Sequence, residues 1–347
     1  MSCKIDKLSF ACDYLEGTHP RILQALNDTN LLQTRGYGAD EYTAEACDLI
    51  RSACGVPDAE VRFFIGGTQA NATVIDAILR PYQGVLAADT AHINGHEAGA
   101  IERGGHKVLT LPSRAGKISA SQIADAVDRY DADLNREHIV MPGMVYITYP
   151  TEYGTLYTLS ELTDISRVCR EKGLTLYLDG ARLAYALACP ENEITLPDLG
   201  RLCDVFYIGG SKCGCLFGEA VVVPDAKLIP HFFPIIKQHG AHLEKGRLLG
   251  IQFIEMFRDG LYLRIGCSAV EYAARIKAAL CENGYHIYLD TPTNQIFVVL
   301  TPDQQERIFR DIELDFWEPL DDGSAVWRIA TSWATRGEDV DRLIGLL

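Results

Sequence analysis

Two short apolar runs in the middle of the chain each end at a charged residue. LYLD (176–179) ends at Asp179, with Arg182 three residues further on, and DVFYIGGSK (204–212) ends at Lys212 among small residues. Open α/β sheets place their ligands at the carboxyl ends of the strands, so the two runs predict a shared pocket. An aspartate and a lysine in one pocket suit pyridoxal 5′-phosphate (PLP), because the lysine bonds the cofactor and the acid partners its ring nitrogen.

A second candidate feature is the junction after the short apolar strand at 62–65. It reads Gly66-Gly67-Thr68 and leads into a helical pattern, TQANATVIDAIL. Adjacent glycines let the backbone approach a ligand closely, and a helix N-terminus offers unpaired N–H groups to an anion. Gly67 and Thr68, with Thr68 at the expected N-cap, are therefore candidate phosphate ligands. An ordinary turn before a capped helix would give the same pattern.

His92 follows a predicted strand at 85–88 and is the third candidate. An imidazole at the end of a strand could pack on a flat cofactor ring or move protons near neutral pH, whereas a solvent-facing loop histidine is the plain alternative. His92 and His96 have the HxxxH spacing of some zinc sites. Because no glutamate follows His92 and no third ligand is evident, no metal site is predicted.

Composition narrows the class of protein. A chain of 347 residues is long for one core, so two domains or a large domain with an appendage are expected. The net charge of −15 argues against a nucleic-acid or anionic-membrane surface, since both need clustered lysine and arginine. The first ten residues contain no secretory signal, and no apolar stretch is long enough to span a bilayer, which predicts a cytoplasmic protein. The eleven scattered cysteines form no CxxC pair and do not indicate a disulfide framework.

The order of predicted elements indicates the fold. Strands and helices alternate from residue 62 to 223, which predicts a largely parallel sheet covered by helices. Residues 226–282 are mostly helical, and the remainder reads as α+β. The predicted organisation is an arm over residues 1–20, a large α/β domain over 21–240 and a small α+β domain over 241–347. Locally, Thr43 is expected to cap a helix, and 93–100 is expected to be helical.

Several motifs occur in the same order as in a known protein family. They are YGADEYT, GGTQAN, TAHINGHEAGAIERGGHKV, PTEYGTLYTLSEL, LYLDGARLAYAL, GGSKCGCLFGEAVV and RIATSWATRGEDVDRL. Together they resemble the threonine aldolase family, also described as aromatic amino acid β-eliminating lyase-like, of fold-type I PLP enzymes. The resemblance covers nearly the whole chain and implies a large domain with a mostly parallel sheet of the seven-stranded type, plus a smaller α+β domain. Many members read GTKN around the lysine, where this chain has Ser211, Lys212 and Cys213.

The resemblance also implies a role for each candidate residue. Lys212 would carry the cofactor, Asp179 would bind its ring nitrogen, Gly67 and Thr68 its phosphate, and His92 would pack on the ring and is a candidate acceptor of the substrate's hydroxyl proton. Arg182 would contribute to the cofactor site and, with Arg328, bind the substrate carboxylate, a task that suits planar guanidinium groups. The loop of Tyr37 and Asp40 would reach the site of a neighbouring subunit in a homodimer or homotetramer. The plain alternatives are helix capping by Asp179, a surface charge at Arg182, a strand-edge charge at Arg328 that opposes aggregation, and a solvated Lys212.

The activity implied by the resemblance is a retro-aldol cleavage. A low-specificity threonine aldolase is an aldehyde-lyase that splits L-threonine or L-allo-threonine into glycine and an aldehyde, with no nucleic acid or membrane involved. The lysine and aspartate are shared with enzymes that catalyse transamination or β-elimination, so these reactions remain alternatives. A catalytically silent paralogue that kept the fold is a third.

Overall fold

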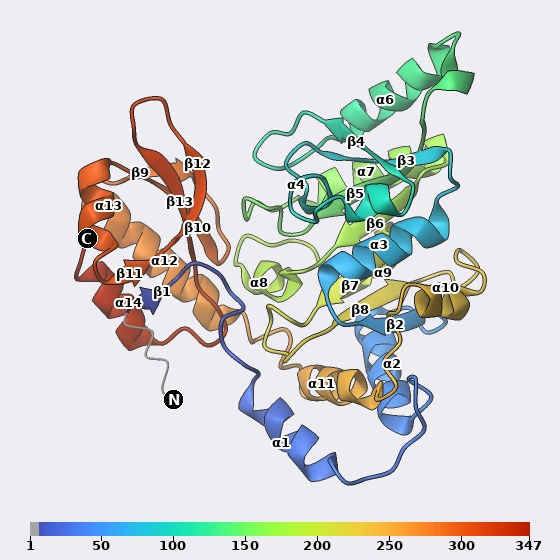
Figure 1. Ribbon diagram of the computed structural model, residues 1–347, viewed down its shortest axis with the longest axis horizontal. Helices are drawn as coiled ribbons and strands as arrows, with labels where there is room; N and C mark the ends of the chain where they lie inside the picture. Colours follow the sequence, from blue (N-terminus) through green and yellow to red (C-terminus); the bar gives the residue numbers. More distant parts are fainter. Residues whose placement is uncertain (1–6) are drawn as a thin grey trace.

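A seven-stranded sheet runs through the larger part of the molecule, and the computed structural model describes residues 7–347 (Figure 1). Its strands lie in the order β2 (Glu60–Phe64), β8 (Glu219–Val223), β7 (Val205–Gly209), β6 (Thr175–Asp179), β5 (Met141–Thr148), β3 (Gln83–Ala88) and β4 (Lys107–Leu111). Strand β8 runs in the opposite direction to the other six strands. The carboxyl ends of the other six strands therefore meet at one edge. The predicted fold class, with its mostly parallel sheet, is confirmed.

Helices cover the sheet in two rows of packed neighbours. One row contains α10 (Phe232–Gln238), α3 (Gly67–Ile78) and α5 (Ala100–Arg103), and the other contains α2 (Glu41–Cys54), α9 (Leu196–Leu202), α7 (Leu159–Lys172) and α6 (Ala120–Ala132). Right-handed crossovers between parallel strands place the rows on opposite faces. The remaining helices of this part are α1 (Pro20–Thr29), α4 (His92–Gly95), α8 (Leu183–Ala188), α11 (Arg247–Phe257) and the short 3-10 helix at Arg136–His138.

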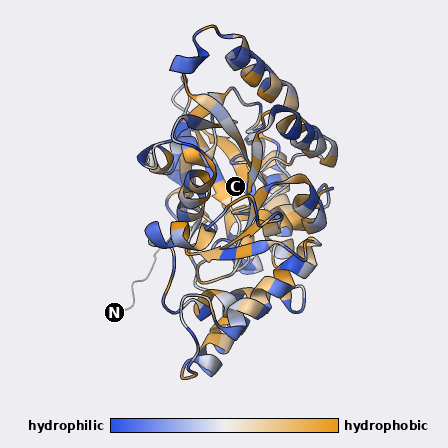
Figure 2. Ribbon diagram, turned by 90° about the vertical axis from the view of Figure 1, so that its right-hand side faces the viewer, coloured by the Kyte–Doolittle hydropathy of each residue, from blue (hydrophilic) through white to orange (hydrophobic). Residues whose placement is uncertain are grey.

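The central strands are apolar on both faces because both faces are covered. Every residue of β7, VFYIG, and of β8, EAVVV, is buried. Strands that are covered by helices on both faces characteristically read as such nearly continuous apolar runs. Figure 2 shows hydrophobic colour on the inner strands, while hydrophilic colour lies on the outer helices. No helix within residues 7–347 is long and apolar enough to cross a membrane.

A smaller antiparallel sheet forms the second part of the molecule, drawn at the left of Figure 1. Its order is β12 (Asp315–Pro319), β13 (Ala325–Ala330), β10 (Gln295–Leu300) and β9 (His286–Leu289), and it packs with α12 (Cys267–Glu282), α13 (Pro302–Ile308) and α14 (Gly337–Ile344). Helix α12 joins the two hydrophobic cores, since Val270 belongs to the larger and Ile276 to the smaller. The domain limits at residues 20 and 240 remain predictions.

The N-terminal segment links the two parts. Strand β1 (Leu8–Ser9) pairs in parallel with β11 (Ile312–Glu313), and Phe10 is buried in the smaller core. The chain then crosses to the larger part, where the amide of His19 donates a hydrogen bond to the carbonyl of Gly214 (2.8 Å). Of the predicted arm, residues 1–6 lie outside the described residues.

Three local predictions were wrong. Asp40, not Thr43, is the N-cap of α2, and its side chain accepts a hydrogen bond from the amide of Thr43 (2.8 Å). Helix α3 begins one residue before Thr68, and its N-cap is Gly66, which has no side chain to cap it. Residues 93–100 do not form one helix, because the left-handed backbone of Ala98 (φ 52°) and Gly99 (φ 75°) separates α4 from α5.

Close backbone contact at the end of β7 gives the first testable prediction. A side-chain carbon at Gly209 would lie 2.6 Å from the carbonyl oxygen of Gly180 and would overlap that of Ala181. Gly209→Ala is expected to destabilise the protein by about 1–3 kcal/mol, as overpacking does. Urea unfolding measures the change. Gly17→Ala is the matched control, since nothing lies within 4 Å of its added carbon; equal unfolding midpoints for the two variants would contradict the prediction.

Candidate active site

Most of the predicted site residues gather in one hollow at the carboxyl edge of the large sheet. Its inner part is lined by Gly67, Thr68, His92, Thr148, Pro150, Glu152, Asp179, Ala181, Arg182, Tyr207 and Lys212. The outer part shares four of these residues and opens between the two sheets. Its lining is Tyr14, Thr90, His92, His96, Glu152, Arg182, Lys212, Asp315, Phe316, Trp317 and Arg328. The structure thus brings seven of the nine predicted residues to one place.

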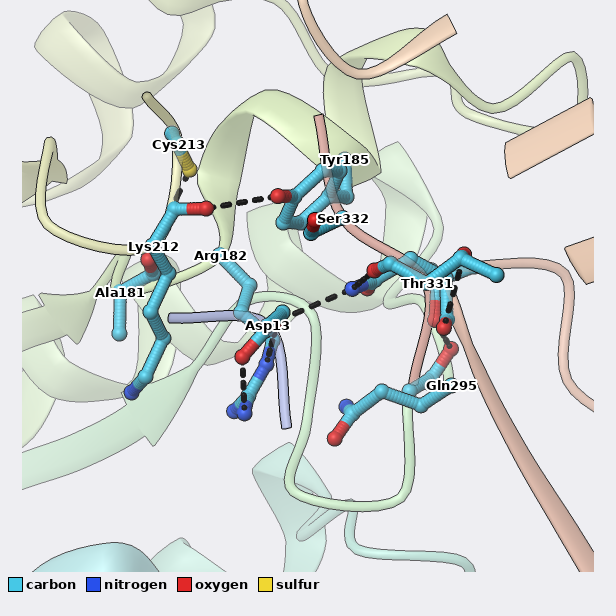
Figure 3. Close-up of polar contacts among 12 residues, drawn as sticks. Asp13, Ala181, Arg182, Tyr185, Lys212, Cys213, Gln295, Thr331 and Ser332 are labelled. Carbon is cyan, nitrogen blue, oxygen red and sulfur yellow. Dashed lines mark hydrogen bonds and ion pairs between the residues drawn. The ribbon is translucent and has the colours of Figure 1, made fainter. Parts of the chain in front are cut away.

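Lys212 lies in the tight loop between β7 and β8. Its backbone carbonyl accepts a hydrogen bond from the hydroxyl of Tyr185 (2.6 Å), whereas no residue within 7–347 forms a hydrogen bond or ion pair with its amine. Figure 3 shows the side chain extending away from this backbone anchor, on the side of Arg182 and Asp13. A held backbone and an uncommitted amine are what covalent attachment of a carbonyl compound requires.

The cysteines beside Lys212 are part of the core. Cys213 and Cys215 are buried, and burial raises the pKa of the Cys213 thiol to about 12. A thiol with so high a pKa is a poor nucleophile and metal ligand at neutral pH. The ten cysteines within residues 7–347 are all free thiols, while Cys3 lies outside the described residues.

Asp179 ends β6 and is held by donors on both carboxylate oxygens. Oδ2 accepts hydrogen bonds from the hydroxyl of Tyr146 (2.5 Å) and the amide of Asn71 (3.1 Å), and Oδ1 accepts one from the backbone amide of Ala181 (2.9 Å). Asp179 is buried and lines the hollow with Lys212. It is therefore a fixed acceptor for a donor that enters the hollow.

His92 is tied to the same network through Glu97. Its Nδ1 lies 2.8 Å from Oε1 of Glu97, and that oxygen also accepts a hydrogen bond from the amide of Asn71 (2.8 Å). Burial opposes protonation of His92, but the hydrogen bond to Glu97 and the charges of Glu152 and Asp179 outweigh it and raise the pKa of the imidazole. With Nδ1 engaged, Nε2 is the ring atom left to exchange a proton with a ligand.

The N-terminus of α3 faces the hollow as an anion site. The helix has no side-chain cap, and Thr68 contributes a hydroxyl beside its first N–H groups. A side-chain carbon at Gly67 would lie 2.9 Å from the hydroxyl of Tyr207, so only glycine leaves this approach open. An uncapped helix start, a hydroxyl and a glycine are the parts of a phosphate site.

Arg182 and Arg328 lie close enough to influence one another, and each has an acidic partner. Arg182 makes two hydrogen bonds to Asp13, from Nε (2.6 Å) and Nη2 (3.0 Å), and both side chains are buried. Nη2 of Arg328 pairs with Asp315 (2.7 Å), which is 41% exposed. Burial and the charge of Arg182 lower the pKa of Arg328. Two neighbouring guanidinium groups in a hollow favour an anionic ligand.

Tyr37 and Asp40 are the two predicted residues that lie elsewhere. Asp40 is buried as the N-cap of α2, while Tyr37 is exposed, with the Lys237 amine 4.0 Å from the centre of its ring. They are on the side of the molecule formed by α2 and the segment before α11 and do not line the hollow of Lys212. A role in another subunit's site remains a prediction.

Sequence reasoning missed four residues that shape this site. Asn71, Glu97 and Glu152 stand inside motifs that carry the family resemblance but were given no role. Asp13 had no local signal, because its partner Arg182 is 169 residues away in the chain. Of these four residues, Glu97 could have been found from the sequence, because it directly follows the HxxxH motif of His92 and His96.

Comparisons with known proteins identify the family of the chain. A family model described as Beta-eliminating lyase matches residues 19–301. A low specificity L-threonine aldolase from a Pseudomonas species is 32% identical over 342 residues, covering 96% of this chain and 95% of the relative. The one from Pseudomonas aeruginosa is also 32% identical, covering 96% and 94%.

Solved structures extend the likeness to three dimensions. The structure of Leishmania major threonine aldolase is 42% identical, covers 98% of both chains and superposes with a TM-score of 0.95. An aspartate aminotransferase from Thermus thermophilus shares the fold at 14% identity, with a TM-score of 0.74 over 99% of this chain and 91% of its own.

The buried pair of Asp13 and Arg182 generates the second prediction. Burial opposes ionisation of Asp13, but the charge and hydrogen bonds of Arg182 outweigh it and lower the pKa of the carboxyl. Because the folded pKa lies below the unfolded value of about 3.9, the stabilisation is fully present above that pH and is lost as the pH falls through the folded pKa. Asp13→Asn is expected to cost about 3–5 kcal/mol, since it leaves a buried charge without its partner.

Chemical denaturation at pH 7 and pH 5 measures this cost. The difference between wild type and Asp13→Asn is expected to be the same at both values and to shrink only in stronger acid. Asp58→Asn, at an exposed position, serves as the control. A difference that already disappears at pH 5 would show that the carboxyl is not held ionised by Arg182.

Proposed function

The chain belongs to the β-eliminating lyase family, and from this membership we propose that it is a PLP-dependent threonine aldolase. The reaction cleaves L-threonine or L-allo-threonine to glycine and an aldehyde. The observation that carries the proposal is the hollow itself, which holds Lys212, Asp179 and His92 together at the sheet edge in a chain similar to threonine aldolases over nearly its whole length.

The residues present fit PLP. Lys212 offers an uncommitted amine, Asp179 a fixed acceptor for the ring nitrogen, and the start of α3 an anion site for the phosphate. His92 lines the space between them. The cofactor supplies an electron-accepting ring, which stores the electron pair left on the substrate's Cα when a bond to that carbon breaks.

The side chains of the protein select which bond breaks. Arg182 and Arg328 bind the substrate carboxylate, and a molecule held at that end presents one bond of Cα for cleavage. Arg182 is fixed by Asp13, so its orientation is set before substrate arrives. His92, held at Nδ1 by Glu97, can hold or move a proton at Nε2 beside the substrate hydroxyl.

The activity itself is the third prediction. Purified protein supplied with PLP and L-threonine is expected to release acetaldehyde and glycine, and Lys212→Ala is expected to abolish the release because the amine that bonds the cofactor is gone. An aldehyde assay with amino-acid analysis measures both products. Lys227→Ala, on an exposed lysine, is the control.

The other products would point to other reactions on the same scaffold. Ammonia with a keto acid would indicate β-elimination, and a new amino acid formed from an added keto acid would indicate transamination. Protein that binds no PLP and forms no product would be the silent paralogue.

We also propose that the protein works as a homodimer or homotetramer. Support comes from exposed apolar side chains that precede the Tyr37 loop in the sequence: the adjacent Leu31 (91% exposed) and Leu32 (53%), and Leu23 (61%) in α1. Adjacent exposed apolar residues commonly mark an interface between proteins. The loop of Tyr37 would then lie where a second copy can approach.

Light scattering tests the assembly. The wild type is expected at two or four times the mass of the chain, and Leu31→Asp with Leu32→Asp is expected to shift it to the monomer. Leu134→Asp is the control, because Leu134 is equally exposed (98%) but outside this segment. A wild type that is monomeric at micromolar concentration would contradict the proposal.

A further inference from the structure

Asp179, Glu152 and Asp315 line the hollow, and Asp13 and Glu97 bind two of its lining residues, Arg182 and His92. Four of these five carboxylates are occupied by partners. Asp13 binds Arg182, Asp179 binds Tyr146 and Asn71, Glu97 binds His92 and Asn71, and Asp315 binds Arg328. The fifth, Glu152, forms no hydrogen bond or ion pair with any residue in the described part of the chain. It is also the one carboxylate that lines both the inner and the outer part of the hollow.

The backbone on either side of Glu152 is anchored. Thr151 is buried, its amide donates a hydrogen bond to the carbonyl of Thr155 (3.0 Å), and the two hydroxyls lie 2.7 Å apart. On the other side, Tyr153 packs against Phe297 and Trp317 at ring separations of 5.4 and 5.3 Å. The loop therefore presents the Glu152 side chain to the hollow from a fixed position.

Glu152 lines both parts of the hollow together with His92 and Arg182, and the electrostatics of these two residues agree with this placement. Its charge is among the causes that raise the pKa of His92, and it also raises that of Arg182. Glu152 thus lies near both the imidazole and the guanidinium proposed to hold the substrate carboxylate. In a β-hydroxy-α-amino acid the carboxylate and the carbon bearing the hydroxyl are both bonded to Cα, so a group in this position is within reach of that hydroxyl.

We propose that Glu152 is the base that accepts the proton of the substrate's β-hydroxyl, an inference that rests on the proposed aldolase function. The O–H electron pair becomes the second bond of the aldehyde carbonyl, and the Cα–Cβ pair remains with Cα. The proton moves to a carboxylate oxygen of Glu152. After the aldehyde leaves, Cα takes up one proton to give glycine, so the atoms and charges balance.

His92 has a complementary part in this scheme. A raised pKa keeps more of the imidazole in its protonated, donating form near neutral pH. A donor and an acceptor are then placed side by side in the hollow, and the carboxylate is the acceptor. Enzymes commonly shift the pKa values of two neighbouring groups apart, so that one acts as the acid and the other as the base.

Glu152→Gln keeps the shape of the side chain and removes the base. With PLP bound, L-threonine cleavage by this variant is expected to fall about 100-fold or more in kcat, the usual size of a lost general base. Exchange of the α-hydrogen of glycine in heavy water is expected to stay within about threefold of wild type, since glycine has no β-hydroxyl and this step needs no such base. Glu152→Asp, which keeps a carboxylate, is expected to recover part of the cleavage, and Glu191→Gln, on an exposed loop, is expected to match wild type in both assays.

Parallel loss of cleavage and glycine exchange would overturn the proposal, because it would mean that Glu152 supports the site as a whole. Unchanged cleavage would also overturn it. If the wild type exchanged glycine but did not cleave threonine, the proposed aldolase function would fail instead, so the two failures are distinguishable.

A measurement without cofactor tests the placement of Glu152 independently of activity. Nuclear magnetic resonance titration of the His92 ring in the cofactor-free protein is expected to show a lower pKa in Glu152→Gln than in wild type, because a neighbouring negative charge is removed. An unchanged His92 titration would show that the carboxylate does not face the imidazole and would overturn the assignment.

Discussion

The buried ion pair between Asp13 and Arg182 holds the site together. Asp13 reaches Arg182, just after β6, and its Oδ2 also accepts a hydrogen bond from the amide of Asn294 (2.9 Å) in the smaller part. Three distant segments of the chain therefore meet at one carboxylate. A buried charge without its partner is costly, so the arm, the large sheet and the small sheet are constrained to close around the hollow together.

The same constraint explains how so many charges share a small space. Lys212, Arg182 and Arg328 lie among the five carboxylates named above, and hydrogen bonds or an ion pair give four of these acids a partner. The Lys212 amine and the Glu152 carboxylate form no hydrogen bond or ion pair within residues 7–347. The fixed groups position the site, and the uncommitted ones are available to react.

The sequence predicted the parts of the site that depend on local order. Lys212 and Gly67 follow strands and Asp179 ends one. Because strands of a parallel sheet end at one edge, the meeting of these three residues could be inferred. The ion pair of Asp13 with Arg182 could not be inferred, because it depends on the path of the N-terminal arm across the folded protein. Strand β12, which brings Asp315 and Trp317 to the outer hollow, was also missed; DFWEP has an edge position and a proline that weaken its strand signal.

The sequence predicted which helices exist better than it predicted where they begin and end. The helix predicted to be capped by Thr43 exists, but Asp40 is its N-cap and Glu41 its first residue. Aspartate and threonine are both good caps, and spacing does not choose between them. The stretch 93–100 contains helical spacing, yet the tertiary path needs a left-handed turn at Gly99. His92 therefore lies in a short helix of four residues, with Glu97 in the turn that follows it.

The attachment point of the cofactor is the most direct test of this view of the site. Borohydride reduction of the purified protein with PLP makes a lysine–cofactor bond permanent, and mass spectrometry of the digested protein locates it. The bond is predicted on the peptide that contains Lys212 and on no other. A cofactor found on a different lysine, or no covalent label on PLP-saturated protein, would contradict the assignment of this hollow as the active site.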